Sequence, residues 1–134
     1  MNDQFLLRNQ VGSILYLTLN NQNQRNSLSR RLLTELKDSF DDTQNDPTVR
    51  VVVVRSKGPA FSSGHDLHEL VNRDTEDYAS LFAACTSVME AIRLSPKPVI
   101  AEVQGIATAA GCQLVATCDL AIASESALFA TPGV

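Results

Sequence analysis

The sequence predicts a single α/β domain with a parallel sheet, and three observations lead to this prediction. Short apolar runs alternate with stretches whose apolar residues recur at helical spacing, as strands and helices do in α/β proteins. Four consecutive valines at residues 51–54 form a strand without polar alternation, which is typical of a parallel sheet buried on both faces. The length of 134 residues suits one domain, spanning residues 1–134.

The first half of the chain predicts a hairpin, a helix and the valine strand. Residues 5–19 predict the hairpin, with its turn near residues 10–13, because Leu15, Leu17 and Leu19 fall on one face of its second arm. Residues 20–27 are polar and predict a loop. Ser29 is a suitable N-cap for a helix over residues 30–44, which Pro47 ends. The strand over residues 50–55 follows.

In the second half, two small-residue stretches each follow a strand and precede a helix. Residues 58–66 lead from the valine strand to a short helix at 66–71. Residues 105–111 lead from a strand at 99–103 to a helix at 110–117. Between them, residues 75–94 predict a longer helix, whose apolar side includes Phe82 and Cys85. Strands at 120–123 and 127–130 complete the pattern.

The small-residue stretches have two interpretations that the residues alone leave open. Small side chains let a ligand approach the backbone, and a helix start offers unpaired N–H groups that can hold an oxyanion. Alternatively, glycine and alanine simply allow a strand and a helix to pack closely. Two such stretches in one domain could direct two N–H donors at one carbonyl oxygen.

Composition excludes several classes of function. The net charge of −4 comes from scattered charges, so neither a nucleic-acid partner nor a membrane is expected. The histidines and cysteines show no zinc-site spacing, and no metal is expected. Cys85, Cys112 and Cys118 are interpreted as buried free thiols. No transit or signal segment is recognisable, so we expect a cytoplasmic protein, or a mitochondrial one if a transit peptide has been removed.

Three stretches together resemble the crotonase (enoyl-CoA hydratase/isomerase) superfamily. They are Phe-Ser-Ser-Gly-His-Asp-Leu at residues 61–67, Ala-Thr-Ala-Ala-Gly-Cys-Gln-Leu-Val-Ala at 107–116, and Arg-Asn-Ser-Leu at 25–28. The resemblance runs from about Val11 to the Phe-Ala-Thr-Pro-Gly-Val of residues 129–134, and it is closest to one subgroup of the superfamily. It implies the crotonase ββα spiral (ClpP/crotonase fold). Because the family's domain continues well beyond this point, the chain resembles a C-terminally truncated, N-terminal half of it.

The resemblance implies that the chain binds a coenzyme A thioester as substrate or ligand, with no separate cofactor. The backbone N–H groups of His65 and Ala110 match the two donors of the family's oxyanion hole. For the full-length domain the resemblance implies a homotrimer or hexamer. The residues that it implies at the CoA site are Arg25, Ser27, Ser63, Asp66, Leu67, His68 and Gly111.

The two glutamates that hydratases of the family use are absent. Their positions are occupied by Gln113, whose amide does not exchange a proton near neutrality, and by Gly133. The resemblance therefore implies the oxyanion hole without the groups that protonate the substrate and activate water.

Three functions stay open. The first is an acyl-CoA enzyme of lipid or fatty-acid metabolism, of lyase, isomerase or decarboxylase type; residues 63–70 resemble a family decarboxylase of malonyl-type thioesters. The second is a non-catalytic acyl-CoA-binding pseudoenzyme or regulatory protein. The third is an inert truncated product with interaction roles only. The sequence names neither the acyl group nor the reaction.

Overall fold

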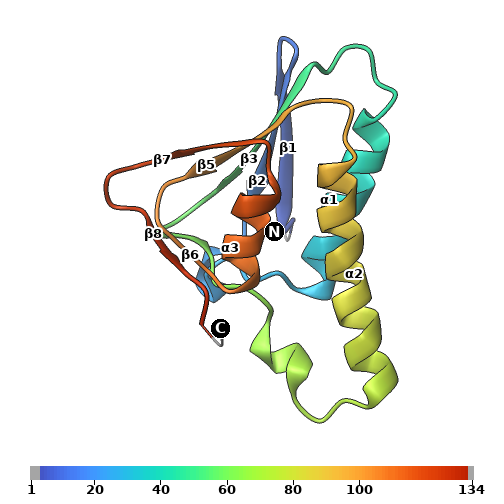
Figure 1. The fold of residues 1–134 in the computed structure, drawn as a ribbon, viewed down its shortest axis with the longest axis vertical. Coiled ribbons are helices and arrows are strands. Elements are labelled where there is room, and N and C mark those ends of the chain that lie inside the picture. Colours follow the sequence, from blue (N-terminus) through green and yellow to red (C-terminus); the bar gives the residue numbers. More distant parts are fainter. Residues whose placement is uncertain (1–3, 133–134) are drawn as a thin grey trace.

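The computed structural model describes residues 4–132, which form two sheets and three α-helices (Figure 1). In spatial order, the larger sheet contains β1 (Leu6–Val11), β2 (Ile14–Leu19), β3 (Val51–Ser56), β5 (Val99–Val103) and β7 (Leu120–Ala123). The smaller sheet contains β4 (Ala60–Ser62), β6 (Ile106–Thr108) and β8 (Leu128–Ala130). The helices are α1 (Arg30–Thr43), α2 (Thr75–Arg93) and α3 (Ala110–Thr117).

The larger sheet confirms the predicted α/β class. Strands β1 and β2 form the expected antiparallel hairpin, with Gly12 at a φ of +60° in the connecting turn. Every other strand pair in the larger sheet is parallel: β2 with β3, β3 with β5, and β5 with β7. Figure 1 shows α1 and α2 side by side along one side of the molecule, with α3 between α2 and the strands.

One face of the larger sheet makes the core with α1 and α2. Leu17 and Leu19 of β2 are fully buried, as are Val52 and Val54 of β3. The apolar stripe of α1 is buried in this core, and it consists of Leu32, Leu33, Leu36 and Phe40. Ser29 caps α1 as expected, because its hydroxyl accepts a hydrogen bond of 3.2 Å from the Leu32 N–H.

Three burial expectations differ from the structure. Val51 and Val53 are only half-buried, because within residues 4–132 no helix covers the second face of β3. Phe82 lies on the expected side of α2 but is 49% exposed, since it borders an open cavity instead of the core. The thiols also differ from the expectation: Cys85 is buried, whereas Cys112 and Cys118 are half-buried.

Two of the three strands of the smaller sheet were not predicted, whereas β8 corresponds to the strand expected at 127–130. Both small-residue stretches contain a three-residue strand, β4 in the first and β6 in the second, and these strands pair in parallel. Three residues are too few to show a strand period, and their small side chains resemble a turn. The short helix expected at 66–71 is a 3-10 helix, Leu67–Leu70, which Asp66 caps through the His68 N–H at 2.9 Å.

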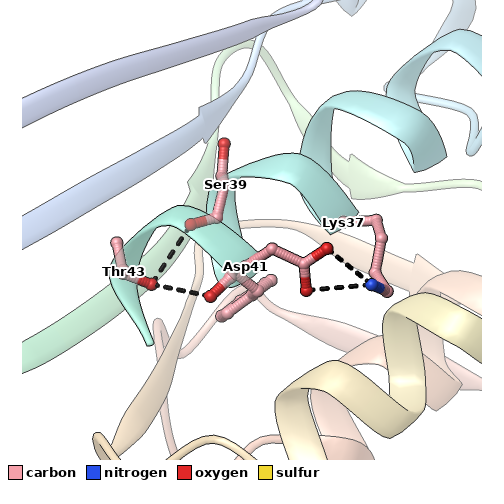
Figure 2. Close-up of polar contacts among 5 residues, drawn as sticks. Lys37, Ser39, Asp41 and Thr43 are labelled. Carbon is pink, nitrogen blue, oxygen red and sulfur yellow. Dashed lines mark hydrogen bonds and ion pairs between the residues drawn. The ribbon is translucent and has the colours of Figure 1, made fainter. Parts of the chain in front are cut away.

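Helix α1 ends in a polar cluster on its last turns (Figure 2). The buried Thr43 hydroxyl contacts the carbonyl oxygens of Ser39 and Phe40, both at 3.1 Å. Lys37 and Asp41 form an ion pair one turn apart, which supports the exposed side of the same turns.

The loop between β2 and α1 is held by one fully buried side chain, Asn26. Its amide nitrogen donates to the carbonyl oxygens of Lys57 and Ala60, at 2.8 and 2.9 Å, and its amide oxygen accepts from the Asn21 N–H at 2.8 Å. Arg25 and Asn26 both have a φ of +52°, in the left-handed region that asparagine tolerates better than most residues. Asn26 therefore ties the loop to the segment that leads into β4.

We predict that Asn26→Ala lowers the free energy of unfolding by about 2–4 kcal/mol, because it removes three hydrogen bonds and leaves buried partners unpaired. Urea denaturation followed by circular dichroism measures this. Asn23→Ala, at an exposed position of the same loop, is the matched control and should cost less than about 0.5 kcal/mol. Equal losses in the two variants would contradict the role of Asn26.

Candidate active site

The two small-residue stretches meet because β4 and β6 are parallel neighbours. Ala60 lies opposite Ile106, and Ser62 lies opposite Ala107. Parallel strands end at the same edge of their sheet, so the residues that follow them come together. His65 lies three residues beyond the end of β4, and Ala110 lies two residues beyond the end of β6. The expected convergence of these two backbone positions follows from this pairing.

Three glycines make the contact between the stretches close. A Cβ on Gly105 would overlap the Pro59 carbonyl oxygen, and a Cβ on Gly111 would overlap the Ser62 carbonyl oxygen. A Cβ on Gly64 would lie 3.2 Å from the Ala110 nitrogen. Gly105 and Gly111 thus serve chain packing, which was one of the two interpretations of the small residues. Gly111 is buried in this contact and borders neither of the cavities described below.

Helix α3 begins with an unusual backbone conformation. Ala109 precedes the helix with a φ of +54° and a ψ of −125°, a region that residues other than glycine rarely adopt. Such conformations cost about 1–3 kcal/mol and persist where surrounding contacts enforce them. Here the Ala109 N–H donates to the Ala130 carbonyl oxygen at 3.0 Å, which ties the turn to β8.

Within residues 4–132, neither the His65 N–H nor the Ala110 N–H donates a hydrogen bond. For Ala110 the cause is its position as the first residue of α3, where an α-helix leaves its N–H groups without an internal acceptor. For His65 the neighbouring groups are used instead: the Gly64 carbonyl accepts from the Leu28 N–H at 2.6 Å, and the Ser63 N–H donates to the Arg25 carbonyl at 3.0 Å. Two unpaired amides therefore follow the paired strands.

A polar cavity of about 230 Å³ borders His65. Seven of the site residues that the resemblance implied line this cavity. They are Arg25, Ser27, Ser63, His65, Asp66, Leu67 and His68. The Ser27 hydroxyl is buried and, among the described residues, has no hydrogen-bond partner. Asn23 and Gln24 also line this polar cavity, and sequence reasoning treated them as plain loop residues.

An apolar cavity of about 590 Å³ also borders His65. Ala110 and Gln113 of α3 line it, as expected for residues of one site. The other lining residues were not singled out as site residues, because they come from two helices and a strand end that only the fold brings together. They are Phe82, Cys85, Thr86, Ala109, Cys112, Ala116, Thr131 and Pro132.

His65 is the one described residue that borders both the polar and the apolar cavity. Its ring packs edge-on against Phe82, with the ring centroids 5.1 Å apart. Burial lowers the pKa of His65 below its usual value, although the Glu69 carboxylate opposes this shift, so the ring is neutral at pH 7. Its Nδ1 atom is buried and, within residues 4–132, has no hydrogen-bond partner.

The two positions without the family's glutamates differ in where they lie. Gln113 is exposed on α3 and faces the apolar cavity, whereas Gly133 lies outside the described residues. A separate groove of about 330 Å³ between α1 and α2 contains none of the implied site residues. Residues 4–132 contain no cluster of three or more metal-ligating side chains. Among the described helices, none combines the length and apolar character needed to cross a membrane.

Comparisons with known proteins agree with this architecture. The family described as Enoyl-CoA hydratase/isomerase matches residues 9–134. Enoyl-CoA hydratase domain-containing protein 3 of Danio rerio is 46% identical over 129 residues, which cover 96% of this chain and 45% of that protein. The crystal structure of the human protein of that name has a TM-score of 0.94 at 43% identity, over 97% of this chain and 52% of that one. An enoyl-CoA hydratase from Mycobacterium smegmatis gives 0.92 at 47% identity, over 95% and 50%.

The chain therefore belongs to the enoyl-CoA hydratase/isomerase family and has the crotonase fold. Within that family it is similar to enoyl-CoA hydratase domain-containing protein 3, the subgroup that its motifs resemble, and it spans about half the length of these relatives. The Danio rerio relative is named as mitochondrial, which agrees with the mitochondrial alternative and gives no support to a cytoplasmic location.

We predict that Gly111→Ala lowers the free energy of unfolding by about 3 kcal/mol, because the new methyl group would overlap the Ser62 carbonyl oxygen and force α3 away from β4. Gly12→Ala is the control: its methyl group would enter open space, and only the positive φ costs about 1 kcal/mol. Urea denaturation measures both values. If the Gly111 variant is as stable as the Gly12 variant, the close contact between Gly111 and Ser62 does not limit the stability of the fold.

Proposed function

We propose that this chain binds an acyl-CoA thioester with the thioester carbonyl oxygen between the backbone N–H groups of His65 and Ala110. The observation that carries the proposal is the pair of unpaired amides at the adjoining ends of β4 and β6, with a polar cavity and an apolar cavity that both border His65. A thioester has the same division, because its carbonyl separates an apolar acyl chain from a long polar carrier.

In this arrangement the acyl chain occupies the apolar cavity beside α2 and α3. The pantetheine and nucleotide parts lie along the polar cavity, where the Ser27 hydroxyl supplies an unused hydrogen-bonding group. Arg25 contributes a positive charge at the same place, which suits an anionic phosphate. His68 borders the cavity too, and its ring nitrogen contacts the Asp66 carboxylate at 3.0 Å.

The two amides would act when the carbonyl oxygen gains negative charge, as it does on enolisation, on nucleophilic attack or on loss of an adjacent carboxylate. A fixed N–H donor of this kind contributes about 3 kcal/mol to the transition state. The first turn of α3 adds the partial positive charge of a helix N-terminus. Both donors belong to the backbone, so His65 and Ala110 can differ from other family members in side chain and still supply them.

We propose further that hydration is not the reaction. Among the described residues that line the apolar cavity there is no carboxylate, and Gln113 cannot transfer a proton near neutrality. An enolate-stabilising reaction that needs no carboxylate base, such as decarboxylation of a malonyl-type thioester, fits this lining. The second candidate is a non-catalytic acyl-CoA-binding protein, and the amide of Gln113 is the observation that favours it.

We predict that crotonyl-CoA is hydrated at less than about a tenth of an ordinary turnover number, which is near 10 per second, because no group activates water. Loss of the enoyl absorbance measures the rate, with mass spectrometry to identify the product. Parallel incubation with a malonyl-type thioester distinguishes a decarboxylase from a simple binder. Catalytic formation of a 3-hydroxyacyl product at an ordinary rate would refute this part of the proposal.

We also predict that replacing the Ala110 amide by an ester weakens butyryl-CoA binding about tenfold, because lactic acid at this position removes the N–H and keeps the chain geometry. Isothermal calorimetry measures the affinity. Proline is unsuitable here, since Ala109 would precede it with a φ of +54° and a ψ of −125°.

His65→Ala is the matched control for the ester, because it keeps the second backbone donor and removes only the imidazole. It should retain butyryl-CoA binding, with circular dichroism confirming the fold of both variants. If His65→Ala abolishes binding while the ester at Ala110 leaves it intact, the imidazole is the binding group and the assignment of the two backbone donors is wrong.

A further inference from the structure

Two of the three cysteine thiols line the apolar cavity. Cys85 comes from α2 and Cys112 from α3, and the three cysteines are free. Cys118 does not line it: the residue lies at the C-terminal end of α3, where its sulfur donates to the Leu114 carbonyl oxygen at 3.3 Å. A thiol is a far stronger nucleophile than water. In a cavity with two thiols and no carboxylate, a cysteine can therefore add to a bound ligand where a hydratase would add water.

The environments of the three thiols differ. Burial raises the pKa of the Cys85 thiol, which is only 5% exposed. Burial and the neighbouring Asp119 carboxylate raise the pKa of Cys118 to about 12. Cys112 is half-buried and is the third residue of α3. Of the two cysteines that line the apolar cavity, Cys112 is therefore the more accessible one.

We propose that Cys112 is a covalent modification site for 2-enoyl thioesters bound in the apolar cavity. The inference rests on the proposed function, because it needs the thioester carbonyl at the His65 and Ala110 amides. The acyl chain then enters the cavity from the side of Ala110. Its β-carbon is the second carbon atom after the carbonyl carbon. Cys112, two residues after Ala110 on the same helix, lines the cavity that receives this carbon.

The step is a conjugate addition. The Cys112 sulfur forms a bond to the β-carbon, and the π bond between the α- and β-carbons breaks. Its electrons delocalise onto the carbonyl oxygen, where the two backbone N–H groups hold the enolate. The thiol proton ends on the α-carbon, so the adduct contains every atom of the thioester and needs no further reactant. Coenzyme A is not released, and one chain takes up one molecule.

Intact-protein mass spectrometry after incubation with crotonyl-CoA tests the proposal. We expect a mass gain equal to one whole crotonyl-CoA, and peptide mapping should place it on Cys112. Labelling of Cys112 should be at least about tenfold faster than labelling of Cys85 or Cys118, because burial disfavours the thiolate at those two positions. Saturation with crotonyl-CoA and protection by butyryl-CoA, which has no double bond, should show that labelling follows binding.

Matched variants make the result independent of a single substitution. Cys112→Ser should abolish the adduct, whereas Cys118→Ser, at a free cysteine outside the apolar cavity, should retain both the adduct and butyryl-CoA binding. Cys112→Ala serves the same purpose if the serine variant does not fold, as judged by circular dichroism. Mapping on the unmodified sequence requires no variant at all.

The possible outcomes distinguish a failure of the Cys112 inference from a failure of the proposed function. Butyryl-CoA binding without an adduct overturns the role of Cys112 and leaves the proposed function standing. Absence of butyryl-CoA binding overturns both. An adduct that is spread over the three cysteines, or that butyryl-CoA does not suppress, also overturns the inference, because it reflects unguided thiol chemistry. A mass gain of the acyl group alone would indicate acyl transfer and would likewise contradict conjugate addition.

Discussion

The backbone contact between the β4 segment and the α3 segment is the constraint on which the candidate site depends. Gly105 and Gly111 let the carbonyl groups of Pro59 and Ser62 approach so closely that no side chain fits between them. This closeness brings the ends of β4 and β6 to one place, where the first N–H of α3 has no partner within residues 4–132. Glycine is therefore needed at these positions because of space, and the chemistry of the site follows from the packing.

The character of the site comes from where polar and apolar groups are placed around that contact. On the loop side, the Asn26 side chain makes three hydrogen bonds, while the neighbouring Ser27 hydroxyl is buried and has no partner in the described part of the chain. On the helix side, the lining is mostly apolar, and a hydrogen bond is electrostatically stronger in such surroundings than in water. A pair of backbone donors at the boundary can thus stabilise charge without any ionised side chain.

The sequence allowed most of the larger sheet and all three α-helices to be predicted, because their apolar residues recur over several turns or strand repeats. The resemblance to the family suggested His65 and Ala110 as a pair of backbone donors, and this assignment stays a prediction. The sequence did not reveal β4 and β6, whose three-residue length carries no period. Phe82 and Cys85 were placed together on the apolar side of α2, and Cys85 is indeed buried in the core. Phe82 is half exposed beside the apolar cavity, because helical spacing does not distinguish a core residue from a cavity wall.

The position of His65 has one more consequence. Its ring forms a shared wall between the polar and the apolar cavity and rests against Phe82. Any group that displaces the ring on entering one cavity also changes the free energy of occupying the other. Such coupling is reciprocal, so the effect has the same size whichever cavity fills first. The affinity of a ligand that spans both cavities is then not simply the sum of the affinities of its two ends.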